Sequence, residues 1–162
     1  MKKFEFTGET KTTIGGIVLH RIKALVRIDL GYSTIIEVGD LGGWLEKEDN
    51  LSYLGNAWVS GDAEVLGDAK IYGDSKVYDD ACINKCSHIL NIGPIGSRNE
   101  FTTFFRTKDR KIKVSCGCFL GTIDEFLEKV KQTHRDSKHA IVYRAAADVA
   151  LAQIDTSDEN DT

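Results

Sequence analysis

The chain lacks the features that mark several common classes of protein. It has no stretch of about 18 consecutive apolar residues, so no transmembrane helix is expected. Lys2 and Lys3 are not followed by an apolar run, so no secretory signal is expected either. Acidic residues outnumber basic ones by 25 to 21, and the net charge of −4 argues against a general nucleic-acid binder. We therefore expect a cytoplasmic protein whose partners include neither a membrane nor a nucleic acid.

Cysteine is present in moderate number, and its spacing does not indicate a metal site. The four cysteines are Cys82, Cys86, Cys116 and Cys118. Structural zinc sites usually show two C-x-x-C knuckles, whereas Cys116-Gly-Cys118 is a C-x-C pair and the other two cysteines lie in the six-residue repeat without a second knuckle spacing. This pair could be a redox pair, half of a zinc site or a place of close packing at Gly117, and packing is the default interpretation. We expect free thiols, no metal and no cofactor.

The feature that the chain does have is a six-residue repeat from Gly55 to Leu90. It runs GNAWVS, GDAEVL, GDAKIY, GDSKVY, DDACIN, KCSHIL. Small residues recur at Ala57, Ala63, Ala69, Ser75, Ala81 and Ser87, and β-branched residues recur at Val59, Val65, Ile71, Val77, Ile83 and Ile89. One apolar position in every six residues predicts a parallel β-helix built from hexapeptides, with about two coils.

The repeat resembles the left-handed β-helix of hexapeptide-repeat proteins. The segment GDLGGWLEKEDNLSYLGNAWVSGDAEV is similar to the start of such proteins in bacteria and their phages. The resemblance implies the left hand of the coil, which the spacing alone does not give. Many members are trimeric acyltransferases, but this chain has no long loop inserted in the repeat. A degenerate acyltransferase is therefore only an alternative.

The predicted fold class is mainly β with a C-terminal α part. It comprises a β-rich N-terminal cap (1–50), a short left-handed parallel β-helix of about two to three coils (51–92), a ββαα unit (93–154) and a disordered acidic tail (155–162). A hairpin is predicted from residues 102–107 and 111–116. One helix should begin at Thr122, because Thr122 and Glu125 have capping-box spacing. A second helix is predicted over residues 138–154, with Leu151 among its inward residues.

The segment from Gly93 to Phe119 is the candidate ligand site. Between residues 98 and 113 it has six basic residues against two acids, with hydroxyl and aromatic side chains between them. Such a mixture suits a phosphate or nucleotide ligand, although a charged outer face of a soluble hairpin would look the same. The candidate ligand-binding residues are Ser97, Arg98, Asn99, Thr102, Thr103, Phe104, Phe105, Arg106, Cys118, Phe119 and His134. No catalytic residue is assigned.

The C-terminal stretch, with IGSRN, TTFF and SCGCF, is similar to a domain in small proteins of gut bacteria and their phages. The resemblance implies a phage context and a host-cell cytoplasmic location. The leading hypothesis is a homo-oligomer, trimer or dimer, that captures a nucleotide-like anion and so sequesters a host immune signal. The first alternative is a protein–protein inhibitor or adaptor acting through a column of acids, Asp62, Asp68, Asp74 and Asp80. The second is an enzyme that uses Cys116 or Cys118 with His134.

Overall fold

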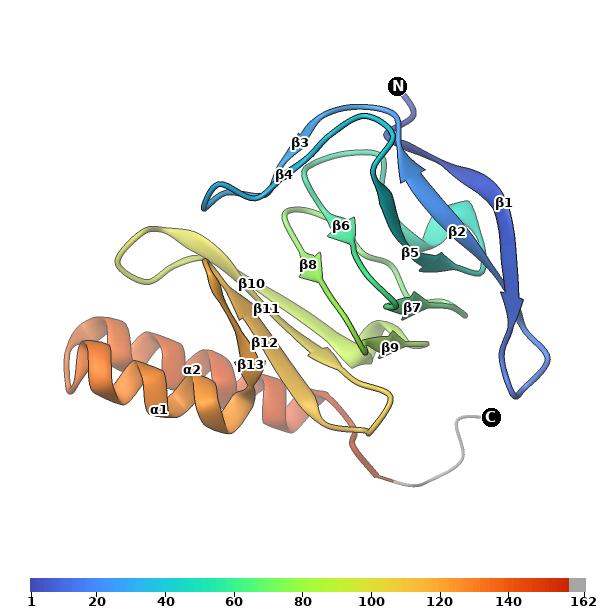
Figure 1. Ribbon diagram of the computed structural model, residues 1–162. Helices are drawn as coiled ribbons and strands as arrows, with labels where there is room; N and C mark the ends of the chain where they lie inside the picture. The colour runs from blue at the N-terminus through green and yellow to red at the C-terminus, as the bar shows by residue number, and fades with distance from the viewer. Residues whose placement is uncertain (158–162) are drawn as a thin grey trace. The chain divides into compact units, whose positions relative to one another are not determined.

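A computed structural model describes residues 1–157, which divide into two compact units (Figure 1). The first unit is Met1–Cys86 and the second begins at Ser87. A disordered tail was predicted for residues 155–162, and residues 158–162 of it lie outside the described residues.

The first unit consists of short strands. They are β1 (Phe4–Thr12), β2 (Val18–Ala24), β3 (Ile28–Asp29), β4 (Ile35–Ile36), β5 (Leu41–Leu45), β6 (Trp58–Val59), β7 (Glu64–Val65), β8 (Lys76–Val77) and β9 (Cys82–Ile83). A 3-10 turn, η1 (Glu48–Asn50), follows β5, and a second, η2 (Cys86–His88), lies at the boundary of the units. One sheet has the order β1-β2-β5-β7-β9, while β3 pairs with β4 and β6 pairs with β8.

The prediction of a left-handed parallel β-helix is wrong. The repeat strands are two residues long and fall into separate sheets. The largest sheet is mixed, because β7 and β9 pair in parallel behind β5, while β5, β2 and β1 are antiparallel to one another. The sheet of the second unit is antiparallel throughout. The six-residue period predicts which residues are buried, but it does not determine which strands from outside the repeat pair with the repeat strands.

The burial pattern of the repeat in the first unit agrees with the period. The side chains of Val59, Val65, Ile71, Val77 and Ile83 are all fully buried. The parallel pairs β6–β8 and β7–β9 join residues 18 positions apart, such as Trp58 with Lys76 and Glu64 with Cys82. Gly55 and Gly67 are required where the chain turns, because each has a positive φ and a Cβ there would lie 2.5–2.6 Å from a backbone carbonyl oxygen.

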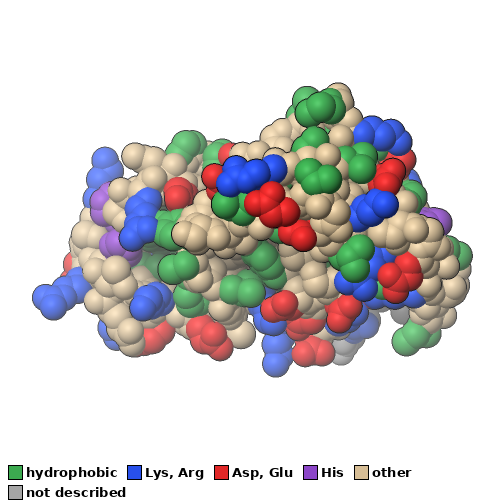
Figure 2. All heavy atoms as spheres, turned by 45° about the horizontal axis from the view of Figure 1, so that its top comes forward, with side chains coloured by type: hydrophobic (Ala, Val, Ile, Leu, Met, Phe, Trp, Pro, Cys, Tyr) green, Lys and Arg blue, Asp and Glu red, His purple; other side chains and the backbone are tan. Residues whose placement is uncertain are grey.

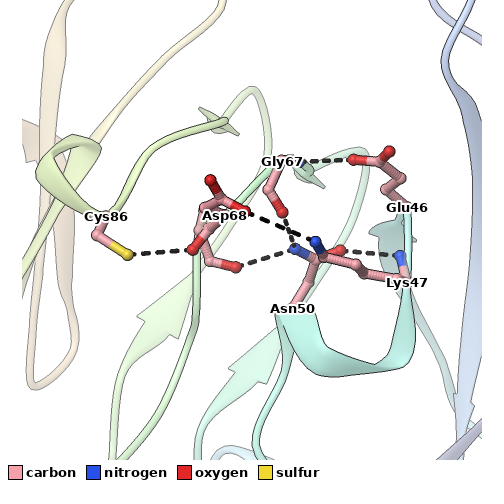
Figure 3. A network of polar contacts seen from close by, with 7 residues as sticks. Glu46, Lys47, Asn50, Gly67, Asp68 and Cys86 are labelled. Atoms are coloured by element: carbon pink, nitrogen blue, oxygen red, sulfur yellow. Dashed lines mark hydrogen bonds and ion pairs between the residues drawn. The ribbon is translucent and has the colours of Figure 1, made fainter.

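Backbone carbonyls at the start of the repeat receive donors from three different segments. Asn50 is fully buried, and its Nδ2 donates to Gly67 O (3.2 Å) and Ala69 O (2.9 Å), while its Oδ1 accepts from Lys47 N (Figure 3). The backbone N–H of Trp44 donates to Ala63 O at 2.9 Å. These hydrogen bonds give donors to buried carbonyl oxygens that would otherwise have no hydrogen bond.

Lys3 supplies the third set of donors. Its ammonium donates to Ala57 O (2.7 Å) and Gly55 O (3.3 Å), and its side chain is only 4% exposed. Burial lowers the pKa of the Lys3 ammonium to about 8, although the charge of Asp74 opposes this shift. The N-terminal strand is thereby tied to the beginning of the repeat.

Lys3→Met should destabilise the first unit by roughly 1–3 kcal/mol, because two buried carbonyls lose their donor while the apolar stem is kept. Both tryptophans, Trp44 and Trp58, lie in the first unit, so urea unfolding followed by tryptophan fluorescence reports this unit. Unchanged stability would show that the ammonium does not hold the two segments together.

The wild type and Lys3→Met together also test the lowered pKa of Lys3. From about pH 8 to the ordinary value of 10.5, the unfolded chain binds more protons at Lys3 than the folded chain does. The contribution of Lys3 to stability should therefore rise with pH across this window. Tyr53 and Tyr78, whose raised pKa values act in the opposite sense, are common to both proteins and cancel in the difference. Parallel pH profiles of Lys3→Met and the wild type would contradict the assignment.

The second unit is a four-stranded antiparallel sheet with two helices. Its elements are β10 (Ile89–Ile95), β11 (Glu100–Arg106), β12 (Ile112–Cys116), β13 (Phe119–Thr122), α1 (Ile123–His134) and α2 (Lys138–Gln153), and the sheet order is β10-β11-β12-β13. Both helices lie against one face of the sheet (Figure 1). The ring of Phe126 on α1 is central to this core, 5.8 Å from Phe104, 5.8 Å from Phe119 and 5.6 Å from Tyr143.

The hairpin and both helices of this unit are confirmed. Thr122 caps α1 by accepting from Glu125 N at 3.2 Å, and α2 ends within one residue of its predicted limit. The predicted ββαα arrangement lacked β10, which begins inside the last hexapeptide, and β13, which contains Gly121. The inward placement of Leu151 is wrong, because that side chain is 52% exposed.

Candidate functional site

Two turns of the sheet bring several predicted ligand residues to one end of the second unit. Antiparallel neighbours alternate in direction, so the β10–β11 turn (96–99) and the β12–β13 turn (117–118) lie at the same end. Ser97, Arg98, Asn99 and Cys118 are exposed in these turns.

The helices add further residues to that end. α1 finishes at His134, and α2 begins after Ser137. The rings of His134 and Tyr143 are 5.5 Å apart, and the Tyr143 hydroxyl lies 4.0 Å from Cys116 Sγ. The same hydroxyl lies against Gly96, where a Cβ would overlap it. We call residues 96–99, 117–118 and 134–139 the loop end.

Basic residues outnumber acidic ones at the loop end, where Asp136 is the one acid among residues 96–99, 117–118 and 134–139. Arg98, Arg135 and Lys138 are exposed there, and His134 and His139 have their rings 5.7 Å apart. Histidine side chains lie among Lys and Arg side chains at the left of Figure 2, the side on which α1 connects to α2 in Figure 1. α2 has no acidic residue in its first turn, and the backbone N–H groups of a helix N-terminus favour anions.

Four other predicted residues, all on β11, are buried. Phe104 and Phe105 are 0% exposed, so neither ring is available to stack on a ligand. Thr102 Oγ1 donates to Cys116 Sγ (3.3 Å), and Thr103 Oγ1 donates to Asn91 Oδ1 (2.9 Å). Phe119, which is partly exposed, is the one predicted aromatic residue that remains next to the loop end.

The predicted basic run does not form one patch. Arg106 is buried, and its Nη1 lies 2.8 Å from His88 Nε2. A guanidinium can only donate, so this nitrogen of His88 accepts. Lys108 and Arg110 lie in the β11–β12 turn, at the other end of β11 from Arg98. A strand of this length spans roughly 20 Å, so these residues and Arg98 cannot bind the same phosphate.

Two hollows of about 420 Å³ each mark the surface of the second unit. Arg110, Lys111, Thr122, Leu151, Ile154 and other residues line one of them. The second lies between the outer faces of α1 and α2 and is lined by Asp124, Leu127, Glu128, Lys131, Arg144 and Asp148. None of the candidate residues Ser97, Arg98, Asn99, Cys118, Phe119 and His134 is among the residues that line these two hollows.

The acid column of the adaptor hypothesis is not formed. The parallel pairs of the repeat join residues 18 apart and belong to separate sheets. Asp62 and Asp80 are therefore the only two of the four predicted acids at equivalent positions of paired segments. Successive acids six residues apart do not follow one another along a sheet.

The candidate ligand residues taken from the sequence did not include Gly96, Lys138, His139 and Tyr143, which the structure brings to or beside the loop end. Ser137 caps α2 by accepting from Ala140 N, and the two residues after it carry basic side chains. This pattern, a capping serine followed by a first turn without acids, was the available indication of an anion-attracting helix start.

Comparisons with protein-family models, curated proteins and solved structures find no match to this chain. Within residues 1–157, no group of three or more His, Cys, Asp or Glu residues is placed to hold a metal ion. The helices in the same range are too short or too polar to cross a membrane.

Gly96→Ala should destabilise the second unit by roughly 1–3 kcal/mol, because the residue has a φ of +79° and the new Cβ would overlap the Tyr143 hydroxyl. Thermal melting followed by helix circular dichroism measures this, because both α-helices belong to this unit.

Tyr143→Phe provides the control for the Gly96 prediction. Removing the hydroxyl should make Gly96→Ala less costly, so the double variant should be more stable than the sum of the two single effects predicts. Additive effects would show that Gly96 and Tyr143 do not touch as described.

Proposed function

We propose that the second unit binds a nucleotide-like anionic small molecule at the loop end and holds it without chemical change. The observation that carries this proposal is the convergence of the 96–99 turn, the 117–118 turn and the basic start of α2 at one end of the sheet. Six of the predicted ligand residues belong to this end or adjoin it: Ser97, Arg98, Asn99, Cys118, Phe119 and His134.

Each group at the loop end has a role in this proposal. The N-terminus of α2, with Lys138 and His139, attracts a phosphate group. Arg98 adds charge-assisted hydrogen bonds to phosphate oxygens. Ser97 and Asn99 offer hydrogen-bonding groups to a second phosphate or a ribose, and Phe119 offers ring surface to a base.

The biological part of the proposal is the capture of a host immune signal by a phage protein in the host cytoplasm. It depends on the resemblance of the C-terminal stretch to phage proteins. Neither alternative gains support from a specific contact. The acids of the adaptor hypothesis are dispersed. In the enzyme hypothesis a thiol should lie beside His134, but the described contacts bring only the partly buried Cys116 near Tyr143, whose ring lies next to that of His134. The exposed Cys118 has no such contact among those described.

The test is a titration of the purified protein with a fluorescent ATP analogue, competed with unlabelled ATP and pyrophosphate. Arg98→Ala should weaken binding roughly 10-fold or more, because a hydrogen bond to a charged group contributes about 1.5–3 kcal/mol. Lys108→Ala is the matched control, since it removes one exposed positive charge at the opposite end of β11 and should leave the affinity unchanged.

Circular dichroism of both variants shows whether the helices remain folded. Equal loss in the two variants would indicate a nonspecific charge effect and contradict a site at the loop end. No binding of any of the three probes by the wild type would contradict the proposal for nucleotide phosphates.

A further inference from the structure

The two helices of the second unit differ in the face that they turn away from the sheet. On α1 that face is polar, with Asp124, Glu125, Glu128, Lys129, Lys131 and Gln132 exposed. On α2 the exposed residues include Ile141, Ala145, Val149, Leu151 and Ala152, while Ala140, Tyr143, Ala146, Ala147 and Ala150 are buried on the other side. Apolar side chains gathered on the exposed face of a helix are typical of a surface that a protein partner covers.

The exposed residues of α2 follow the spacing of a helix–helix seam. Lys138, Ile141, Ala145, Asp148 and Ala152 are separated by three, four, three and four residues, which places them in one stripe. Ile141 is 61% exposed, and Val149 beside the stripe is 46% exposed. Alanine in the stripe allows two helix backbones to approach closely.

The charges of the stripe are complementary to a second copy of the same stripe. When two such helices pack antiparallel, the alternate positions of one seam face those of the other. This register places Lys138 of one copy opposite Asp148 of the partner subunit, and Ile141 opposite the partner's Ala145, each contact occurring twice. A shift to the next register would instead place the two Asp148 carboxylates near the centre, where they repel each other.

We propose that α2 of one copy packs antiparallel on α2 of a second copy of this chain, forming a two-fold symmetric dimer. The two-fold axis makes every contact of the stripe reciprocal. The overlap covers residues 138–148 of each helix, roughly 16 Å. An interface of this size falls below the roughly 1,200 Å² of a standard stable complex, so the dimer forms reversibly and depends on concentration.

Other charged groups near Asp148 compete with the partner's Lys138. Arg144 precedes it by one turn, but one guanidinium nitrogen donates to Arg135 O at 2.9 Å. Lys131, Glu128 and Asp124 of α1 lie across the hollow that Asp148 also lines. Two acids, Asp124 and Glu128, and two bases, Lys131 and Arg144, thus surround Asp148, and their charges cancel.

The test is sedimentation equilibrium at protein concentrations from about 1 μM to about 1 mM, without added nucleotide, so that its result does not depend on the proposed function. The wild type should show a monomer–dimer equilibrium. Lys138→Glu alone and Asp148→Lys alone should each weaken the dimer at least about threefold, because each places like charges opposite one another twice.

The double variant Lys138→Glu/Asp148→Lys restores opposite charges and should return the dissociation constant to within about threefold of the wild type. Lys129→Glu, on the polar outer face of α1, is the matched control and should have no effect beyond that of overall charge. A wild type that stays monomeric throughout, or a dimer that the double variant does not rescue, would overturn the proposal.

Discussion

The first unit depends on satisfying the backbone carbonyls at the start of its repeat. Within the repeat, the segments around Trp58 and Lys76 and around Glu64 and Cys82 bond to one another. The earliest hexapeptides have no preceding hexapeptide to donate to them, and a buried carbonyl without a donor is costly. Three unrelated groups fill this need at equivalent positions: the ammonium of Lys3 at Ala57, the backbone of Trp44 at Ala63 and the amide of Asn50 at Ala69.

This requirement explains why the sequence predicted burial better than topology. The burial of the β-branched positions was predictable because Val and Ile favour strands and gain free energy when their side chains leave water. The donors were not, because Lys3 and Asn50 lie outside the period and nothing in their local sequence marks them as buried. The antiparallel β1, β2 and β5 then determine that the largest sheet is mixed, which the repeat alone could not indicate.

The second unit was predictable where local signals are strong. Thr122 and Glu125 form a short-range cap, and alternation around the 107–111 turn determines a hairpin. β10 was hidden by its overlap with the hexapeptide pattern, and β13 by its glycine. The charge run of β11 and β12 was misleading because a run in sequence is spread along strands in space. Arg98, Arg106 and Lys108 belong to three different surroundings: an exposed turn, a buried pair with His88, and the opposite end of the sheet.

Helix α2 links the proposed ligand site to the proposed dimer. Its N-terminus contributes Lys138 to the loop end, and the same side chain begins the exposed stripe. In the proposed dimer the ammonium of Lys138 faces the partner's Asp148, whereas in the proposed ligand site it faces a phosphate. One ammonium attracted to two anions from different directions stabilises each of them less than it would stabilise either alone. By linkage, a ligand that draws Lys138 away from the partner weakens the dimer by the same factor as dimerisation weakens ligand binding. The two proposals therefore constrain each other through one residue, although each is tested separately.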